Sequence, residues 1–295
     1  MTGKTVVVTG ANCGIGYETA LELACRNARV ILGCRDIKKA QHAADKIIRK
    51  TGNQDVEAKH LDLASFTSIR KFCNELNSNL SQLDVLINNA GVMKAPYQLT
   101  EDGLETHMAV NHYGNVLLTT LLQDLMRKPD SSRVVFVSSA LHKYGTVDLD
   151  NCNTEEFYNK GKQYGSSKLM NLLYVRILSE KYAADSRISV YTLSPGMVRT
   201  RLGRHSVVFN KYFQIFCFPL YAVLYSLYVL LVKTAREGCQ TVVYCAVAPE
   251  LQGTTGCYYS NCRQEAWSAA AQDKVLARTV YDHTLNFLRS KHQPV

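Results

Sequence analysis

The chain has 295 residues, of which 46% are hydrophobic and 20% are charged. This balance excludes an intrinsically disordered chain and a collagen-like repeat, and the length suits one large domain or two smaller ones. Lys and Arg number 34 against 25 Asp and Glu, which gives a formal net charge of +9. Such an excess indicates a nucleic acid, a phosphorylated cofactor or a lipid surface as partner, unless it only solvates the exterior. Composition does not choose among these alternatives.

The ten cysteines follow neither a disulfide pattern nor a metal-binding pattern. No CxxC pair occurs, and several cysteines stand singly inside apolar segments, where a thiol behaves as a small hydrophobic group. The first apolar run begins at Thr5, and no signal peptide precedes it. We therefore expect reduced thiols in an intracellular protein, with no bound metal.

Short apolar runs alternate with amphipathic stretches along most of the chain. The runs predict seven strands, at residues 5–9, 30–34, 56–61, 83–87, 134–137, 188–193 and 256–260. Between them apolar residues recur at helical spacing, as in the stretch near 164–183. Such βαβ units predict an α/β fold with a doubly wound, mostly parallel, seven-stranded sheet and helices on both faces. No repeat or linker divides the chain, so we expect a single domain over residues 1–295.

Residues 213–232 form the longest apolar run, in which only Gln214 and Ser226 are clearly polar. Its length would allow a transmembrane helix. A crossing would, however, separate predicted strands of one sheet that flank the run on both sides. Two interpretations remain, an internal lid over a substrate pocket or a segment that lies in the membrane interface. Basic residues on both sides of the run favour the interface, so we expect peripheral membrane contact through residues 207–232.

A glycine-rich turn follows the first predicted strand and opens the first predicted helix. Its sequence is Thr9-Gly10-Ala11-Asn12-Cys13-Gly14-Ile15-Gly16. Glycines allow a tight turn and a close approach of the backbone to a pyrophosphate, which the N-terminus of the helix then stabilises. At the start of a βαβ series, the turn predicts a dinucleotide site in a Rossmann fold.

The spacing TGxxxGxG resembles that of the short-chain dehydrogenase/reductase superfamily, and further motifs of that superfamily follow in order. They are Asn88-Asn89-Ala90-Gly91, Asn111, Ser138-Ser139, Tyr164 and Lys168 in a YxxxK motif, and Pro195-Gly196 with Thr200. The resemblance implies a catalytic set of Asn111, Ser139, Tyr164 and Lys168. It implies cofactor contacts by Gly10, Asn12, Gly14, Ile15, Gly16, Arg35, Asp62, Asn89, Ala90, Gly91, Tyr164, Lys168, Pro195, Gly196 and Thr200.

The end of the second predicted strand bears on the choice of cofactor. An acidic residue about 20 positions after the glycine turn binds the ribose 2′-hydroxyl of NAD, and Asp36 stands at that distance from Gly16. Arg35 precedes it, however, and a guanidinium there binds a 2′-phosphate bidentately. Cys34-Arg35-Asp36 is similar to the sequence of the retinol-dehydrogenase-like branch, which implies NADP(H) in preference to NAD(H). Asp62 matches the adenine-binding position of the superfamily, although an acid near a helix start explains it equally well.

Tyr164 and Lys168 are four residues apart on a predicted helix, so their side chains share one face. A phenol titrates near a pKa of about 10, and a fixed ammonium beside it is expected to lower that pKa. By resemblance, Ser139 rather than Ser138 stabilises the developing alkoxide, and Asn111 holds a water relay behind Lys168. Taken singly, each of these residues also has an ordinary structural explanation.

Twenty-four residues separate Ser139 from Tyr164, about twice the usual gap in the superfamily. The added loop, residues 143–163, is similar to an insertion in retinol-dehydrogenase-like members and is expected to shape substrate access. In this alignment His142 and Tyr144 lie near the pocket rim, where single residues are more often structural than functional.

The segment after Pro195-Gly196, residues 201–233, corresponds to the substrate lid of the superfamily, and its apolar composition favours lipophilic ligands. The resemblance implies an NADP(H)-dependent oxidoreductase that interconverts a lipophilic alcohol (retinoid, sterol or other isoprenoid lipid) and its aldehyde or ketone. It also implies a cytosol-facing protein at endoplasmic reticulum or lipid-droplet membrane, with a homodimer and a monomer both open. The alternative is a non-catalytic NADP(H)-binding sensor or scaffold on the same fold. No nucleic-acid partner is expected, because the sequence has neither a basic run of five residues nor a zinc finger.

Overall fold

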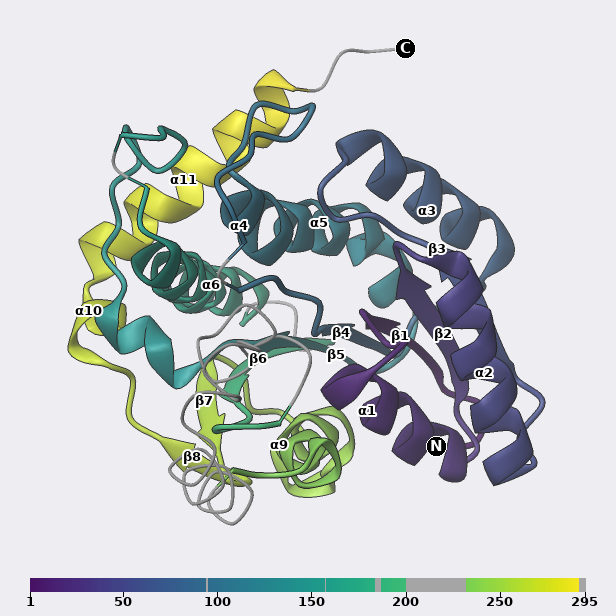
Figure 1. Cartoon of the computed structure of the whole chain (residues 1–295). Coiled ribbons are helices and arrows are strands. Elements are labelled where there is room, and N and C mark those ends of the chain that lie inside the picture. Colours follow the sequence, from purple (N-terminus) through teal and green to yellow (C-terminus); the bar gives the residue numbers. More distant parts are fainter. Residues whose placement is uncertain (94, 157, 184–186, 200–231, 292–295) are drawn as a thin grey trace, which may run out of the picture.

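The computed structural model describes residues 1–93, 95–156, 158–183, 187–199 and 232–291 (Figure 1). Its strands are β1 (Thr5–Thr9), β2 (Arg29–Cys34), β3 (Val56–His60), β4 (Val85–Asn88), β5 (Ser132–Val137), β6 (Ile188–Ser194), β7 (Cys257–Ser260) and β8 (Arg263–Glu265). Its helices are α1 (Gly14–Cys25), α2 (Ile37–Thr51), α3 (Phe66–Asn79), α4 (Thr106–Met108), α5 (Gly114–Met126), α6 (Lys160–Tyr182), α9 (Ala235–Val247), α10 (Ala269–Gln272) and α11 (Lys274–Ser290). Short turns of other helical types are η1 (Ala109–Tyr113), η2 (Ala140–Tyr144) and η5 (Pro249–Leu251).

The strands form one sheet in the order β3-β2-β1-β4-β5-β6-β7-β8. Every neighbouring pair is parallel except β7 and β8, which are antiparallel. The predicted doubly wound, mostly parallel α/β fold is therefore confirmed. The described sheet has eight strands rather than the predicted seven, because the additional strand is short and exposed and gives no apolar signal.

The extra strand β8 is joined to β7 by a two-residue hairpin. Asn261 and Cys262, at the turn, have φ angles of 51° and 58°. Two consecutive positive φ angles are typical of the type I′ turn, whose twist matches that of a two-stranded ribbon. The hairpin thus makes β8 the edge strand of the sheet, next to β7 and near the end of β6.

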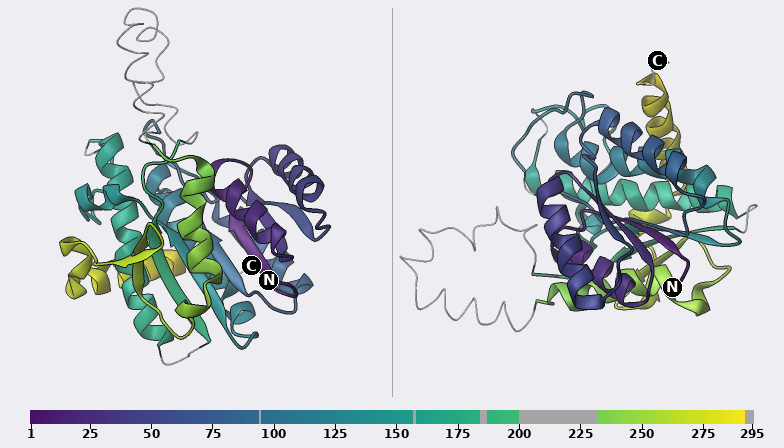
Figure 2. Two further views of the ribbon diagram at one scale, coloured as in Figure 1. Left: turned by 90° about the horizontal axis from the view of Figure 1, so that it is seen from below. Right: turned by 90° about the vertical axis from the view of Figure 1, so that its right-hand side faces the viewer.

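Helices cover both faces of the sheet, as Figures 1 and 2 show. Successive residues of a strand point to opposite faces, so Val6 and Val8 of β1 pack in one core cluster and Val7 in the other. The first cluster includes side chains of α1, α2 and α9, and the second includes those of α3, α5, α6 and α11. The parallel strands are therefore buried on both sides, which explains their nearly continuous apolar sequences.

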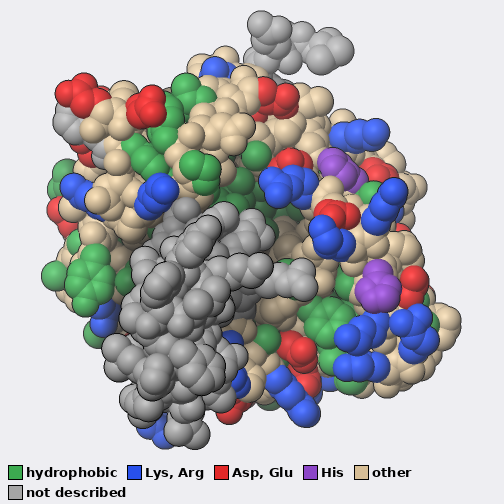
Figure 3. All heavy atoms as spheres, in the orientation of Figure 1, with side chains coloured by type: hydrophobic (Ala, Val, Ile, Leu, Met, Phe, Trp, Pro, Cys, Tyr) green, Lys and Arg blue, Asp and Glu red, His purple; other side chains and the backbone are tan. Residues whose placement is uncertain are grey.

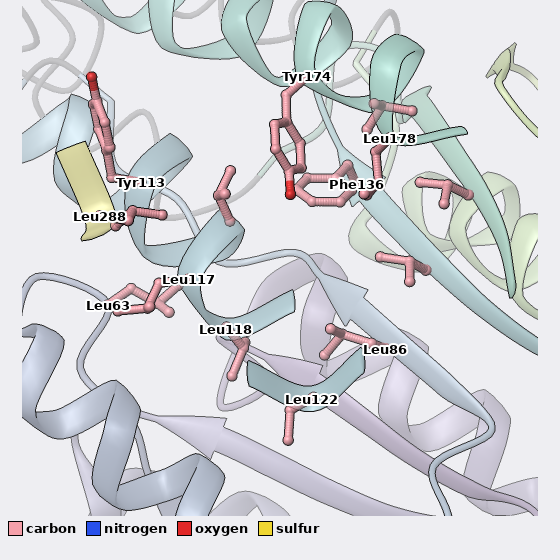
Figure 4. Packing of buried hydrophobic residues seen from close by; sticks show 14 of the residues in the cluster. Leu63, Leu86, Tyr113, Leu117, Leu118, Leu122, Phe136, Tyr174, Leu178 and Leu288 are labelled. Atoms are coloured by element: carbon pink, nitrogen blue, oxygen red, sulfur yellow. The ribbon is translucent and has the colours of Figure 1, made fainter. Parts of the chain in front are cut away.

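Helix α6 is buried on almost every side, because α11 packs across the side that faces away from the sheet. Tyr174 of α6 stacks on Tyr281 of α11 with ring centroids 5.1 Å apart, and it also contacts Phe136 of β5. Figure 4 shows Tyr174 and Phe136 together with the leucines that fill this layer. The helix that carries the YxxxK motif is thus held between the sheet and the C-terminal helix.

Most of the segment expected to form a lid or a membrane contact lies outside the described residues. This holds for residues 200–231, which include Thr200, nearly all of the 207–232 segment and most of the apolar run. Among the residues that the structure describes, no helix is both long enough and apolar enough to cross a membrane. The nine cysteines in the described part of the chain are free thiols.

Candidate active site

A cavity of about 470 Å³ opens at the carboxyl ends of β1 and β4. Between these strands the strand order reverses, because the chain runs outward from β1 to β3 and then returns to the opposite side of β1. In doubly wound sheets, ligands bind in the crevice that this reversal leaves. The predicted residues that line the cavity are Gly10, Asn12, Gly14, Ile15, Gly16, Arg35, Asp62, Asn89, Ala90, Gly91, Tyr164, Lys168 and Pro195.

Other residues line the cavity although the sequence analysis assigned them no role in the site. They include Cys13 and Ser138, which lie within the predicted motifs, and Lys39, Leu61, Leu63, Val92, Met93, Val110 and Val137. Most directly adjoin a predicted strand end or motif, so extending each motif by a few residues would have found them. Lys39 could have been found from helix geometry, because it lies one turn into α2 after Asp36.

The glycine turn leaves the start of α1 open to the cavity. Gly14 has a φ of 59°, and the N-terminus of α1 carries no side-chain cap. An added Cβ at Gly16 would lie 2.5 Å from the Asn89 amide nitrogen and 2.6 Å from the Gly10 carbonyl oxygen. No other residue type fits there unchanged, and the unpaired N–H groups of the first helical turn offer a binding site for an anion.

The motif at the end of β4 braces this turn. The Thr9 hydroxyl accepts hydrogen bonds from the backbone N–H groups of Asn89 and Ala90, at 3.0 and 2.9 Å. In return the Asn89 side chain donates to the Thr9 carbonyl oxygen at 2.8 Å. Asn89 therefore fixes β4 to the glycine turn, in addition to lining the cavity.

At the end of β2, the charged side chain that is free to contact a ligand in the cavity is a cation and not a carboxylate. Asp36 is the N-cap of α2 and accepts from the Lys39 backbone N–H at 3.1 Å and from its ammonium at 2.5 Å. These hydrogen bonds hold the pKa of the Asp36 carboxyl below its ordinary value. Arg35 is exposed beside it, and within the described chain it has no ion pair. The acidic residue that the NAD rule selects is thus engaged in capping a helix.

Asp62 lies at the cavity, but one of its carboxylate oxygens already has a local partner. Its Oδ1 accepts from the backbone N–H of Ala64 at 3.0 Å, and the N-cap of α3 is Ser65. Asp62 is therefore not itself the N-cap of α3, although it stabilises the turn just before that cap, so the alternative of an acid at a helix start holds only in part. Its place in the cavity is compatible with the adenine contact that the resemblance implies.

Tyr164 and Lys168 lie side by side on α6, 4% and 3% exposed, and both line the cavity. The Lys168 ammonium donates to the Val137 carbonyl oxygen at 2.8 Å and lies 5.8 Å from the centre of the Tyr164 ring. Burial lowers the pKa of Lys168 to about 8. Burial also raises the pKa of Tyr164 to about 12, and a hydrogen bond with Ser139 opposes that rise.

The expected lowering of the Tyr164 pKa by Lys168 is therefore wrong for the structure described here. Desolvation of the phenol outweighs the favourable hydrogen bond, and the ammonium is directed to a backbone carbonyl. A phenol with a raised pKa stays protonated at neutral pH. This state suits a proton donor.

The two serines at the end of β5 have different partners. Ser138 is buried, and its hydroxyl donates to the Lys168 carbonyl oxygen at 3.2 Å. Ser139 is the N-cap of η2 and accepts from the Leu141 backbone N–H at 3.2 Å, and its interaction with the Tyr164 phenol opposes the rise of the Tyr164 pKa. The structure thus brings Ser139 to the tyrosine, as the resemblance implies, although Ser138 rather than Ser139 lines the cavity.

Asn111 lies on the π-helical turn η1 behind Lys168 and does not line the cavity. Its side chain accepts from the Val92 backbone N–H at 2.8 Å and donates to the Val92 carbonyl oxygen and the Ser167 hydroxyl. Its own carbonyl oxygen accepts from the side-chain amides of Asn115 and Asn171, at 3.0 and 2.8 Å. These protein contacts occupy most of its hydrogen-bonding groups, so Asn111 braces the loop after β4, and the water relay stays a prediction.

The motif after β6 is only partly at the cavity. Pro195 lines it, whereas Gly196 is exposed, has a φ of 82° and is absent from the lining. Thr200 lies outside the described residues. The chain on either side of the undescribed segment is joined by a bridge between Val198 and Lys233.

The insertion between Ser139 and α6 docks on the loop that follows β4. Its Asn153 accepts from the Tyr97 hydroxyl and from the Glu105 backbone N–H, at 2.9 and 2.8 Å. Tyr144 is 77% exposed and does not line the cavity, so its place at the rim stays a prediction. The same expectation is wrong for His142, which is fully buried behind Ser139 because its ring packs on Tyr258 of β7.

Comparisons with known proteins agree with this fold and site. The family model "short chain dehydrogenase" matches residues 4–208. Human retinol dehydrogenase 14 is 41% identical over 295 residues, covering 96% of this chain and 85% of its own, and human retinol dehydrogenase 11 is 41% identical over 288 residues, covering 98% and 86%. A solved structure of an uncharacterized Mycobacterium paratuberculosis protein has a TM-score of 0.75 at 30% identity, covering 98% of this chain and 94% of its own. Salutaridine reductase from Papaver somniferum, at 22% identity and a TM-score of 0.64 over 87% and 99% of the two chains, shares the fold.

The doubly wound sheet, the glycine turn and the Tyr–Lys helix are thus those of an oxidoreductase family, and the chain belongs to the short-chain dehydrogenases. Within that family it falls in the retinol-dehydrogenase-like branch, which confirms the resemblance drawn from the motifs.

Proposed function

We propose that the protein is an NADP(H)-dependent oxidoreductase that interconverts a lipophilic alcohol and its aldehyde or ketone. The observation that carries the proposal is that Tyr164 and Lys168 line one end of a cavity that begins at the glycine turn, with Ser139 next to Tyr164. These three groups provide a proton donor, a cation and a hydrogen-bond donor within one site, which carbonyl reduction requires.

The residues of the cavity fit a phosphorylated dinucleotide. Gly16 excludes any side chain, so the backbone lies close to the cavity, and the uncapped start of α1 offers N–H groups to a pyrophosphate. Arg35 adds positive charge where β2 ends, while the charge of Asp36 is balanced by that of Lys39. Figure 3 shows Lys and Arg side chains gathered on the side of the molecule where α2 lies. This arrangement favours a 2′-phosphate over a free 2′-hydroxyl.

The proposed mechanism assigns proton transfer to Tyr164. The reduced nicotinamide of bound NADPH supplies the hydride. Tyr164, which is neutral at pH 7, donates its phenolic proton to the substrate oxygen. Ser139 hydrogen-bonds the oxygen as negative charge develops on it. Lys168, with a pKa of about 8, is protonated for most of the time at neutral pH, and at the wall of the cavity its ammonium would bind the nicotinamide ribose next to Tyr164.

A lipophilic substrate is supported by the apolar surface near the catalytic tyrosine. Leu141 and Tyr144 of η2 are 42% and 77% exposed, and Met197, next to Gly196, is 72% exposed. Exposed apolar side chains around a site favour ligands that bury them. The relatives named retinol dehydrogenases also favour a retinoid, sterol or other isoprenoid among lipophilic substrates.

Four further properties belong to the same proposal. The whole chain, residues 1–295, is one catalytic domain, and the segment 207–232 makes peripheral contact with a membrane. Endoplasmic reticulum and lipid droplets are the membranes to test, and a homodimer is an alternative to a monomer.

Liposome flotation tests the membrane contact by comparing the full chain with a variant that lacks residues 207–232. Equal flotation of the two proteins would exclude a contact through this segment.

The Tyr164→Phe variant tests the catalytic assignment. It removes the proton donor but keeps the ring, so turnover of retinal or a steroid ketone with NADPH is expected to fall by at least about 100-fold. NADPH binding, measured by fluorescence titration, is expected to change little. Activity near that of the wild type would contradict the role of Tyr164. Tight NADPH binding by an inactive wild-type protein would instead favour the sensor or scaffold.

The Arg35→Ala variant tests the cofactor assignment. Loss of a charge-assisted contact with the 2′-phosphate is expected to lower kcat/KM for NADPH by about 10- to 150-fold, with little effect on NADH. Lys50→Ala, at the far end of α2, is the matched control for loss of one positive charge. Equal or better kcat/KM with NADH than with NADPH in the wild type would contradict the preference for NADP(H).

A further inference from the structure

The carbonyl group of Ser139 has an unusual second partner, the buried imidazole of His142. The Ser139 carbonyl oxygen accepts from the His142 backbone N–H at 3.0 Å, as a helical turn requires, and also contacts the His142 Nδ1 at 2.6 Å. A carbonyl oxygen only accepts, so Nδ1 carries a proton and donates it. The imidazole thus holds the residue that caps η2.

The other ring nitrogen indicates that this imidazole is neutral. Nε2 is buried and has no hydrogen-bond partner among the described residues, which fits a nitrogen without a proton. Burial lowers the pKa of His142, and the neighbouring charge of Lys143 lowers it further, whereas the contact with Ser139 opposes both. From β7, the group that faces the ring is Tyr258, whose own pKa is raised by burial.

The turn η2 is fixed on two sides by close packing. On one side Gly145 and Gly165 meet directly, so that an added Cβ at Gly145 would lie 2.5 Å from the Gly165 backbone. On the other side the His142 ring packs edge to face on Tyr258, with centroids 5.5 Å apart and planes at 74°. Because Gly165 follows Tyr164 in α6, the position of η2 relative to the catalytic helix is set by these two contacts.

The direction of the Ser139 hydroxyl depends on this turn. Its oxygen accepts from the Leu141 backbone N–H within η2 at 3.2 Å, and its interaction with the Tyr164 phenol opposes the rise of the pKa of that phenol. If the Ser139 carbonyl lost the contact with Nδ1, only the His142 backbone N–H would still hold it, and a turn of this peptide would move the Ser139 hydroxyl with it. A displacement of about 1 Å at a catalytic group costs up to about 100-fold in rate.

We propose that His142 is a positioning residue for Ser139, a role that rests on the proposed function. Its neutral imidazole donates the Nδ1 proton to the Ser139 carbonyl oxygen and so keeps the Ser139 hydroxyl directed at Tyr164. The residue does not touch substrate or cofactor. Its effect on catalysis passes entirely through the serine.

A pair of amide substitutions separates the hydrogen bond from the bulk of the side chain. In His142→Asn the side-chain amide nitrogen takes the place of Nδ1 and keeps the donor, whereas in His142→Gln it takes the place of Nε2. We expect His142→Gln to lower kcat by about 10- to 100-fold with little change in KM for NADPH, and His142→Asn to stay within about threefold of the wild type. His42→Gln, on the exposed side of α2, is the matched control.

A double-mutant cycle with Ser139→Ala distinguishes an effect of His142 that acts through the serine from a general structural effect. If His142 acts through the serine, His142→Gln has no further effect on kcat once Ser139 is alanine. The pH profile of alcohol oxidation gives a second readout, since the hydrogen bond from Ser139 opposes the rise of the Tyr164 pKa. In His142→Gln, we expect the part of the pH profile that depends on ionisation of Tyr164 to move to higher pH. In His142→Asn, that part is expected to lie where it does in the wild type. The titration of Lys168 is common to all variants.

The outcomes are distinguishable from failure of the proposed function. An inactive wild type would reject the function itself. An active wild type in which His142→Gln and His142→Asn are equally active, or equally impaired, would overturn the role of the Nδ1 donor. Additive effects of His142→Gln and Ser139→Ala would overturn it as well. Thermal unfolding of each variant identifies any loss of fold. If His142→Gln does not fold, a folded His142→Asn whose kcat lies more than about threefold below that of the wild type overturns the role.

Discussion

Replacing Lys168 by methionine tests how strongly burial acts on the ammonium at the centre of the site. Burial lowers the pKa of Lys168 from its ordinary 10.5 to about 8, and its ammonium donates to the Val137 carbonyl oxygen. Because the folded-state pKa is depressed, the folded chain binds fewer protons than the unfolded chain between about pH 8 and 10.5. The contribution of this group to the free energy of unfolding therefore rises with pH through that window.

The magnitude follows from the difference between the two pKa values, about 2.5. At about 1.4 kcal/mol for each pK unit, the buried charge destabilises the fold by about 3 kcal/mol below pH 7. Raising the pH to 9.5 removes about 2 kcal/mol of this destabilisation, whereas the Lys168→Met variant has no such charge to lose. At pH 7 the variant also lacks the hydrogen bond to Val137, about 1.5 to 3 kcal/mol, so its stability is expected to stay near that of the wild type.

Urea unfolding followed by far-UV circular dichroism at pH 7 and pH 9.5 gives both free energies. Other titrating groups contribute equally to the two proteins and cancel in the difference between them. We expect that difference to change by about 2 kcal/mol in favour of the wild type on going to pH 9.5. Lys128→Met, which removes an exposed lysine, is the control and should show no pH-dependent difference. A constant difference between wild type and Lys168→Met would refute the reasoning.

Two further substitutions test the glycine turn and the contact of the C-terminal helix. Gly16→Ala places a Cβ at 2.6 Å from a backbone carbonyl oxygen, so NADPH affinity by calorimetry should fall about 10- to 100-fold. Gly161→Ala, whose Cβ would make only an ordinary contact with the Asn159 side chain at 3.7 Å, should bind normally. Thr284→Val leaves the buried Nε2 of His112, now 2.9 Å from the Thr284 hydroxyl, without a partner. The free energy of unfolding of Thr284→Val should fall by about 1 to 3 kcal/mol, and that of the exposed Thr279→Val by much less. Equal losses in the two variants would exclude the hydrogen bond between His112 and Thr284 as the cause.

The amino-acid sequence by itself determined the central strands and the approximate place of the site. The apolar runs of β1, β2, β4, β5 and β6 are visible locally because parallel strands are buried on both faces. The motifs that adjoin these strands meet in one cavity because the carboxyl ends of parallel strands lie along one edge. An exposed edge strand such as β8 lacks this signal, which is why the predicted sheet was one strand short.

Only the tertiary structure decided the state and the partners of the site residues. Burial raises the pKa of Tyr164 and lowers that of Lys168, and burial depends on packing from elements that the local sequence does not contain. In the same way His112 meets Thr284 across 172 residues of chain. His142 lies behind Ser139 rather than at the rim because β7 places Tyr258 against it. Local sequence carries periodicity and motif spacing, whereas desolvation and long-range hydrogen bonds arise only once the chain has folded.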